Sequence, residues 1–197
     1  MAAGATLNIG HANALGSGTL TLDGGILNNT SGGTLTLGGN VAQVWNGAFN
    51  FLGTNDLVMG AGAVTLGATT LVTVTAGNLT VNGVIDDGLD TFNVEKNGAG
   101  TLTLAALNTY GGVIGLNEGT LVFAVDQALT SITNALSLGG FAGSTAAFAL
   151  DLSAASARFG GTMLVQTDNV TPNTITIGAG KTLQIDRSFT IGYNSAA

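Results

Sequence analysis

Three carboxylates stand close together in one short segment, Asp86-Asp87-Gly88-Leu89-Asp90. Carboxylate oxygens are hard ligands, so a cluster of this kind could form part of a Ca²⁺ site. The segment matches neither the calcium loop of an EF-hand nor the Gly-Gly-x-Gly-x-Asp calcium repeat. We therefore interpret it as a solvated turn between strands, with calcium binding as the alternative.

Four other aspartates, Asp56, Asp126, Asp151 and Asp168, are candidates for the hydrolysis of sugars. Hydrolases use two carboxylates that face each other across the sugar, one of them with a raised pKa. Each of these aspartates stands singly in a turn-like setting, and the 4 Lys and Arg residues that lyase chemistry could use are scattered. The sequence predicts no enzyme activity, no catalytic residue, no resident metal and no cofactor.

The histidine and the aromatic residues offer weaker signals. His11 has no second histidine with which to share a metal, so we expect it in a surface turn. Gly-x-Gly phrases abound, but none continues into the Gly-Lys-Ser/Thr of a phosphate loop. Four aromatic residues could contact glycans if they are exposed: Trp45, Phe51, Tyr110 and Tyr193.

The composition narrows the classes of partner. The 197 residues include 32 Gly, 1 Pro and no Cys, and only 8% are charged while 45% are hydrophobic. The net charge of −7 disfavours nucleic acid and anionic membranes, which attract clusters of Lys and Arg. Without cysteine there is no disulfide scaffold or thiolate metal site. No continuous apolar run is long enough to predict a membrane helix.

A repeated phrase, Gly-Thr-Leu-Thr-Leu, predicts the fold. It occurs at residues 18–22, 33–37 and 100–104, and alternation of apolar and polar residues indicates short strands announced by glycine. Gly-Ala-Gly occurs at positions 60–62, 98–100 and 178–180, each time just before an alternating strand. These intervals are multiples of a coil of about 19–20 residues, which gives about ten coils in all. We predict an all-β fold, a single right-handed parallel β-helix over residues 1–197.

The same alternation assigns side chains to the core and to the surface. The predicted core residues are Leu20, Leu22, Leu35, Leu37, Val72, Val74, Leu79, Val81, Leu102, Leu104, Leu121, Phe123, Ile175, Ile177, Leu183 and Ile185. The glycine pairs at 24–25, 38–39, 111–112 and 139–140 are expected to supply corners with positive φ. The alanine-rich segment 148–159 is interpreted as another coil, with a short helix as the alternative.

Pairs of threonines raise the possibility of an ice-binding lattice, which requires one pair per coil in constant register. The Thr-x-Thr pairs lie at positions 19–21, 34–36, 73–75, 101–103 and 174–176, and the intervals between them are unequal. This spacing does not provide a constant register. We therefore expect threonine to keep the outer strand faces soluble without charge.

One segment carries a more specific pattern, Lys-x-Gly-x-Gly-x-Leu-x-Leu, then Asn-x-Tyr-x-Gly, then Gly-x-Leu. The residues in these places are Lys96, Gly98, Gly100, Leu102, Leu104, Asn108, Tyr110, Gly112, Gly119 and Leu121. On these residues the segment 94–123 resembles the autotransporter-associated β-strand repeat of type V passenger domains and very large bacterial surface proteins. The resemblance implies a right-handed parallel β-helix, a secreted or surface stalk that displays other domains, and no catalytic residues.

From these observations we expect a structural rod segment of a bacterial secreted or cell-surface protein, located outside the cell. The sequence begins and ends in strand-like phrases, so we expect a segment of a longer repeat protein. Its expected partners are adjacent coils of the parent protein, or other copies that meet it end to end. The alternative is an adhesin-type module that recognises glycans or surfaces. We expect no nucleic acid partner and no membrane insertion.

Overall fold

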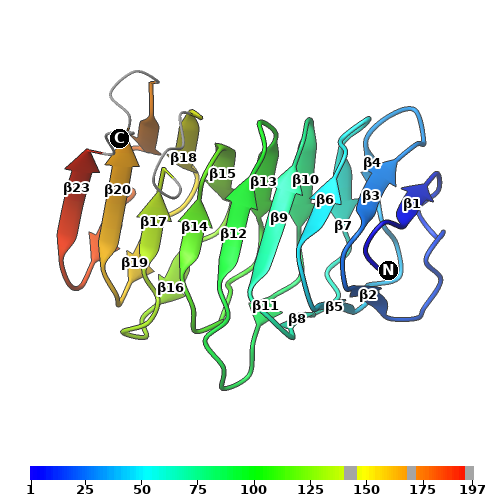
Figure 1. Cartoon of the computed structure of the whole chain (residues 1–197), viewed down its shortest axis with the longest axis horizontal. Helices are drawn as coiled ribbons and strands as arrows, with labels where there is room; N and C mark the ends of the chain where they lie inside the picture. Colours follow the sequence, from blue (N-terminus) through cyan, green and yellow to red (C-terminus); the bar gives the residue numbers. More distant parts are fainter. Residues whose placement is uncertain (140–145, 168–171, 194–197) are drawn as a thin grey trace.

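The computed structural model describes residues 1–139, 146–167 and 172–193, with the side chain of Tyr193 left out. These residues form 23 strands and no helix. The strand pairs of this described part are parallel, and the chain winds through three faces in turn (Figure 1). The predicted all-β fold, a parallel β-solenoid, is confirmed. No helix in the described part of the chain is long and apolar enough to cross a membrane.

Face 1 is a nine-stranded sheet that runs the length of the solenoid. Its strands, in spatial order, are β1 (Thr6–Ile9), β3 (Ile26–Asn29), β6 (Phe49–Phe51), β9 (Thr70–Val74), β12 (Val94–Asn97), β14 (Ile114–Leu116), β17 (Leu136–Leu138), β20 (Met163–Thr167) and β23 (Phe189–Tyr193).

Face 2 is a seven-stranded sheet. It contains β4 (Leu35–Thr36), β7 (Leu57–Met59), β10 (Asn78–Val81), β13 (Thr101–Leu104), β15 (Gly119–Phe123), β18 (Phe148–Leu152) and β21 (Thr174–Ile177).

Face 3 is split into a four-stranded and a three-stranded sheet. The first contains β2 (Leu20–Leu22), β5 (Gln43–Trp45), β8 (Val64–Leu66) and β11 (Ile85–Asp86), and the second β16 (Gln127–Leu129), β19 (Ala157–Phe159) and β22 (Leu183–Ile185). The segment 148–159 thus contributes strands to two faces, and the helix alternative is wrong.

The number of coils differs from the prediction. The nine strands of face 1 correspond to about eight turns, not ten. Between neighbouring strands of this face the register offset is shortest where Thr6 pairs with Ile26 and where Val94 pairs with Ile114, and longest where Leu136 pairs with Met163. The predicted period lies at the short end of this observed range. Longer coils carry extra loop residues, as in the projection between β11 and β12 (Figure 1).

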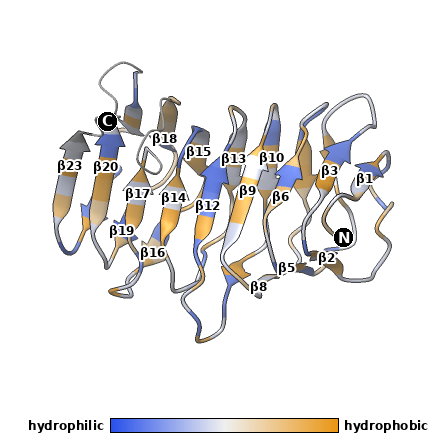
Figure 2. Cartoon of the chain, in the orientation of Figure 1, coloured by the Kyte–Doolittle hydropathy of each residue, from blue (hydrophilic) through white to orange (hydrophobic). Residues whose placement is uncertain are grey.

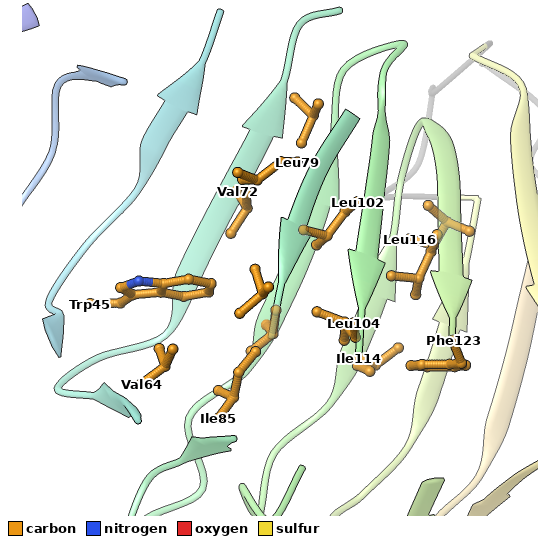
Figure 3. Packing of buried hydrophobic residues seen from close by; sticks show 14 of the residues in the cluster. Trp45, Val64, Val72, Leu79, Ile85, Leu102, Leu104, Ile114, Leu116 and Phe123 are labelled. Carbon is orange, nitrogen blue, oxygen red and sulfur yellow. The ribbon is translucent and has the colours of Figure 1, made fainter. Parts of the chain in front are cut away.

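The core consists of inward side chains stacked in rows, one side chain per turn (Figure 3). One row of face 2 follows the register pairs Leu57, Leu79, Leu102, Leu121, Leu150 and Ile175. The five leucines are at most 2% exposed. The predicted core leucines of the first and central coils are buried or partly buried, because strand alternation points them inward.

The two ends of the solenoid differ. At the N-terminal end Ile9 and Leu22 are fully buried, and Met1, Leu7 and Leu15 pack against the core as partly buried residues. At the C-terminal end Ile177 is 48% exposed and Ile191 66% exposed. The inward residues of the last turn thus lack a covering layer among the described residues, although the predicted inward orientation of Ile177 is correct. In Figure 2 the strands of face 1 carry orange, hydrophobic segments up to β20 and β23 at this end.

Not all of the glycine pairs have the positive φ that was predicted for them. Positive φ occurs at Gly24, Gly25, Gly39 and Gly139, so those corners need glycine for its conformation. The pair at 111–112 has no positive φ. It is required for space instead, because a Cβ on Gly112 would lie 2.1 Å from the carbonyl oxygen of Phe92 in the preceding coil. Residue 140 lies outside the described residues.

Candidate functional site

A lysine occupies an inward position in the core. Lys96 lies between Val72 and Leu116 in a row of face 1, where both neighbouring turns place an apolar side chain, and it is 1% exposed. Its Nζ donates to three backbone carbonyl oxygens at the corner between faces 1 and 2. The acceptors are Asn97 at 2.9 Å, Gly98 at 2.6 Å and Glu118 at 2.9 Å. Lys96 therefore ties its own corner to the corner of the next coil.

Burial shifts the protonation equilibrium of this lysine. Desolvation lowers the pKa of Lys96 to about 8, and the nearby Glu118 carboxylate opposes the shift. Glu118 also accepts a hydrogen bond from the Gly98 amide at 3.2 Å. The ammonium group is enclosed by its three carbonyl partners and by the backbone of the following corner. Because it has no room for a substrate, we assign it a structural role.

Glycines make this corner possible. Gly98 and Gly119 have φ of 78° and 73°, a region that L side chains rarely adopt. A Cβ on Gly119 would lie 2.3 Å from the carbonyl oxygen of Gly98 and 2.9 Å from Lys96 Nζ. The spacing of lysine and glycines in the repeat pattern is therefore explained by one compact corner that encloses an ammonium group.

The acidic segment forms a second corner, between faces 3 and 1. Asp87 is 5% exposed, and its carboxylate accepts hydrogen bonds from the amides of Phe92 and Gly111 at 3.0 Å. Asp86 accepts from the Thr109 hydroxyl at 2.5 Å and the Gly88 amide at 2.8 Å, which hold the pKa of this carboxyl below its usual range. Asp90 lies exposed in the loop.

This geometry argues against the calcium alternative. The carboxylates of Asp86 and Asp87 are engaged by N–H and O–H donors of their own loop and of the next coil. In the described part of the chain, no three Asp, Glu, His or Cys side chains come together in a group that could hold a metal. The predicted solvated turn is also only partly correct, since Asp87 is buried.

Between the two sheets of face 3, one coil has no strand on this face, and buried amide side chains bridge the gap. Asn108 is 2% exposed, and its Oδ1 accepts from the Ile85 amide at 3.0 Å. Its Nδ2 donates to Gln127 Oε1 at 3.2 Å, and Gln127 donates to the Val125 carbonyl at 3.0 Å. These side chains bridge the gap between β11 and β16, so the stack remains continuous through a turn without a face 3 strand.

The tyrosine of the repeat pattern is buried beside these amides. Tyr110 is 0% exposed, and its hydroxyl has no hydrogen-bond partner among the described residues. Burial raises the pKa of Tyr110, and the nearby Asp87 carboxylate raises it further. From the next coil, Asn134 donates to the carbonyl oxygens of Tyr110 at 2.9 Å and Gly112 at 3.1 Å. The Asn-x-Tyr-x-Gly phrase thus belongs to the interior.

Two of the other aromatic candidates for glycan binding are also buried. Trp45 and Phe51 are 0% exposed, and Trp45 packs edge-on against Phe49 with ring centroids 5.1 Å apart. Trp45, Phe51 and Tyr110 thus do not meet the condition of exposure that glycan contact would require, because alternation turns them inward. For Tyr193 the structure describes the backbone, which pairs with Thr167 of β20.

The candidate hydrolase carboxylates are held separately. Asp56 accepts from the amide and the side chain of Asn78, both at 2.8 Å. Asp126 accepts from the Ser156 amide at 2.7 Å, which lowers the pKa of that carboxyl, as does Lys181. Asp151 accepts from the Ser153 amide at 2.7 Å. Asp168 lies outside the described residues.

These three aspartates belong to different coils, and none of their hydrogen-bond partners among the described residues is another carboxylate. Each of these three candidates is thus engaged by nearby amide donors. The absence of enzyme activity stays a prediction.

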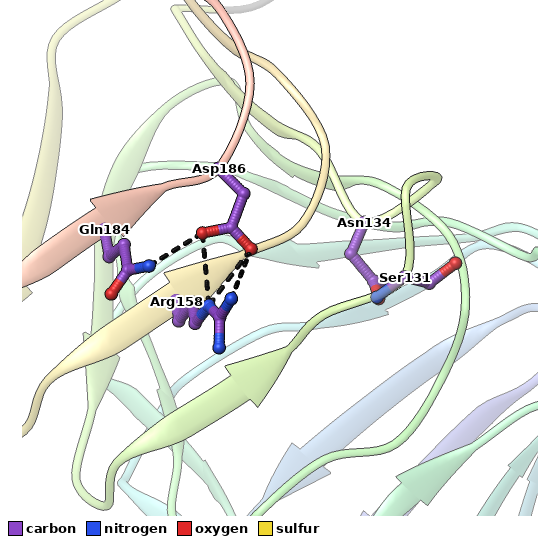
Figure 4. A network of polar contacts seen from close by, with 5 residues as sticks. All are labelled: Ser131, Asn134, Arg158, Gln184 and Asp186. Atoms are coloured by element: carbon purple, nitrogen blue, oxygen red, sulfur yellow. Dashed lines mark hydrogen bonds and ion pairs between the residues drawn. The ribbon is translucent and has the colours of Figure 1, made fainter.

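The polar surface residues also serve to join coils. Arg158 Nη2 lies 2.9 Å from Asp186 Oδ2, and Gln184 donates to the same carboxylate at 2.7 Å (Figure 4). The guanidinium holds the pKa of Asp186 below its usual value. In the same view Asn134 accepts from the Ser131 amide at 2.9 Å. Exposed ion pairs such as Arg158–Asp186 contribute little stability individually.

The threonine pairs lie on strands of all three faces, and the histidine lies in an exposed turn. The Thr-x-Thr pairs at 19–21 and 73–75 border or lie in strands of faces 3 and 1, and the other three pairs border or lie in strands of face 2. They therefore form no common lattice. His11 is exposed, and its Nδ1 accepts from the Asn13 amide at 3.2 Å in a turn.

One feature of the described surface was not predicted, a trough on face 1 near Glu95 and Gly115. An open apolar hollow lies at the C-terminal end near Ile177 and Phe189, where end-to-end contact was expected. A glycine at an outward position in the middle of the phrase Val113-Ile114-Gly115-Leu116 is the one sequence signal that could have indicated the trough.

Comparisons of the chain with models of protein families, with curated proteins and with solved structures give no match.

Proposed function

We propose that the chain is a rod segment of a bacterial secreted or cell-surface protein, which spaces or displays other domains and associates through its C-terminal end. The observation that supports the rod most strongly is the continuity of the inward rows. The row that contains Leu57, Leu102 and Leu150 runs through the described part of face 2 with a buried side chain in every turn from β7 to β18.

The central corners give the rod its cohesion. Lys96, Asp87 and Asn108 each hydrogen-bond to backbone groups of a neighbouring coil, so adjacent coils are linked by polar contacts as well as by apolar stacking. In a solenoid the energy is mostly nearest-neighbour, so such links maintain stiffness along the axis. They also give a physical reason for the repeat pattern of the autotransporter-associated family, to which we propose the chain belongs.

The surface supports a location outside the cell. Outward positions carry mostly Thr, Asn and small residues rather than Lys and Glu. The N-terminal end is closed by its own residues, whereas the C-terminal end presents Ile175, Ile177, Phe189 and Ile191. We therefore place the association at the C-terminal end, where a further solenoid coil or a second copy would cover these residues.

The rod is tested by the distance between its ends. Eight intervals between nine stacked strands of face 1 correspond to about 38 Å at about 4.8 Å per interval. Because the chain has no native cysteine, Thr6→Cys and Thr190→Cys allow two spin labels on outward positions of β1 and β23. A narrow distance distribution near this value is expected. A broad distribution, as from a chain that bends between coils, would contradict a rigid spacer.

A further inference from the structure

The trough lies on the outer side of face 1, across β12, β14, β17 and β20, which are adjacent in the sheet (Figure 1). It has a volume of about 420 Å³. Register pairs place Glu95, Gly115, Ser137 and Leu164 in one outward row that runs along the solenoid axis. The small residues Gly115 and Ser137 lie in the middle of the row, and larger side chains close it at both ends.

Gly115 creates the hollow rather than satisfying a backbone constraint. Its φ is not positive, so its backbone in strand β14 has a conformation that any residue could adopt. A Cβ on Gly115 would lie 3.1 Å from Cγ of Glu95, a flexible side chain that could move aside. A larger residue would therefore fit the fold but fill the trough.

The polar side chains around the trough keep their hydrogen-bonding capacity. Within the described residues the side chains of Glu95, Asn117, Ser137 and Gln166 make no hydrogen bond, and they are only partly exposed. Some carboxylates elsewhere on the surface bond to a neighbouring coil, as Asp56 does with Asn78. These four side chains thus gather unused donors and acceptors along the trough, whereas Asn93, which also lines it, accepts from the Val113 amide at 2.9 Å.

The lining indicates the chemistry of a ligand. A carboxylate accepts hydrogen bonds, amide side chains donate and accept them, and hydroxyls do both, which suits the vicinal hydroxyls of a sugar. Leu164, Val113 and Ala135 add apolar surface for the C–H face of a ring. The interval of about 4.8 Å between strands is close to the spacing of sugar units in an extended glycan. We propose that the trough binds a short neutral oligosaccharide laid along the solenoid axis.

Other ligands fit less well. Among the described residues that line the trough none is Lys or Arg, and Glu95 would repel phosphate, nucleic acid or an acidic glycan. One carboxylate in this described lining is too few for a hard cation that takes several oxygen ligands from the protein. A basic peptide is attracted by Glu95, but it would leave the uncharged amides and hydroxyls with weaker partners. This inference is independent of the proposed rod, since a rod can exist without a bound sugar.

Calorimetric titration of the whole chain tests the proposal. The probes are cellotetraose, laminaritetraose, maltotetraose and N,N′,N″,N‴-tetraacetylchitotetraose, with hexalysine and tetragalacturonate as charged comparisons. We expect at least one neutral tetrasaccharide to bind with a Kd of about 1 mM or below. Gly115→Leu, which fills the floor, is expected to weaken that affinity at least tenfold, and Glu95→Gln to weaken it less.

The matched control is Thr103→Leu, which adds an outward leucine on face 2, away from the trough. It should leave the affinity unchanged. If Gly115→Leu fails to give the wild-type circular dichroism spectrum, Ser137→Leu takes its place as the filling variant. The proposal is overturned if none of the four neutral sugars binds, if Gly115→Leu and Thr103→Leu weaken binding equally, or if hexalysine alone binds.

Discussion

The central coils and the last coil are built from the same rows of side chains but surround them differently. Leu102 and Ile175 occupy one row of face 2, and they are 0% and 37% exposed. In face 1 the same contrast separates Leu116, at 0%, from Ile191, at 66%. An inward position in a solenoid is thus fully buried when other residues of the chain cover both sides of it, as neighbouring coils do for Leu102 and Leu116. The stability of each coil therefore depends on its neighbours.

The largest expected effect compares one substitution at both places. Leu102→Ala removes a fully enclosed side chain and should lower the free energy of unfolding by about 2–5 kcal/mol, since the coils above and below cannot close the cavity. Ile175→Ala, in the same row but open on one side, should cost less than about 1 kcal/mol. Urea denaturation followed by circular dichroism measures both, and equal losses would remove the contrast.

A second comparison concerns the lysine in the core. The folded-state pKa of Lys96 is about 8 and its ordinary value is 10.5, so between these values the unfolded chain holds a proton that the folded chain has released. Stability should therefore rise with pH in this window, by about 2–3 kcal/mol between pH 8 and 10. Above pH 10 the raised pKa of Tyr110 acts in the opposite direction, because the unfolded tyrosine ionises first.

Urea titrations at pH 8, 9 and 10 measure this rise, and Lys96→Met should abolish it. Lys181→Met is the matched control, because this lysine lies at the surface of the last coil with Nζ 3.6 Å from Asp126. That variant should keep the wild-type pH dependence. If the wild type's free energy of unfolding does not change with pH, or if both variants lose the pH dependence equally, the lowered pKa of Lys96 is contradicted.

A smaller effect is expected from the buried tyrosine. Tyr110→Phe removes a hydroxyl that has no partner among the described residues, so the variant should be as stable as the wild type or more stable by about 1 kcal/mol. At the last coil, Thr176→Val changes an exposed hydroxyl and should alter stability by less than about 0.5 kcal/mol. Thermal unfolding compares them, and a loss above about 1 kcal/mol in Tyr110→Phe would reveal a partner for its hydroxyl.

The sequence predicts which side chains of a strand point inward, but it does not predict how completely neighbouring coils cover them. Alternation of period two assigns Leu102 and Ile175 inward regardless of what covers them, so the strand faces could be predicted and their burial could not. The predicted coil length was read from Gly-Ala-Gly phrases that precede strands of different faces, β8 and β22 on face 3 and β13 on face 2. Counting strands of a single face was necessary to obtain about eight turns.

The polar residues of the interior were harder to predict. Asp87 and Lys96 look like surface residues in the sequence, since charged side chains are rarely buried without partners. Their partners are backbone groups of the next coil, Gly111 for Asp87 and Glu118 for Lys96, and these become neighbours only when the coils stack. The same stacking buries Trp45 and Tyr110. The proposed sugar site therefore lies at Glu95 and Gly115 and not at these aromatic residues.

Our central proposal is that the chain associates through its C-terminal end, where inward residues lack a covering layer among the described residues, and sedimentation velocity of single substitutions in β23 tests it most directly. Ile191 points inward and Thr190 outward in the same strand, so Ile191→Lys and Thr190→Lys add the same charge to opposite sides. The wild type and Thr190→Lys should associate with rising concentration, and Ile191→Lys should remain monomeric. A wild type that is strictly monomeric at high concentration, or equal association of all three proteins, would contradict the account.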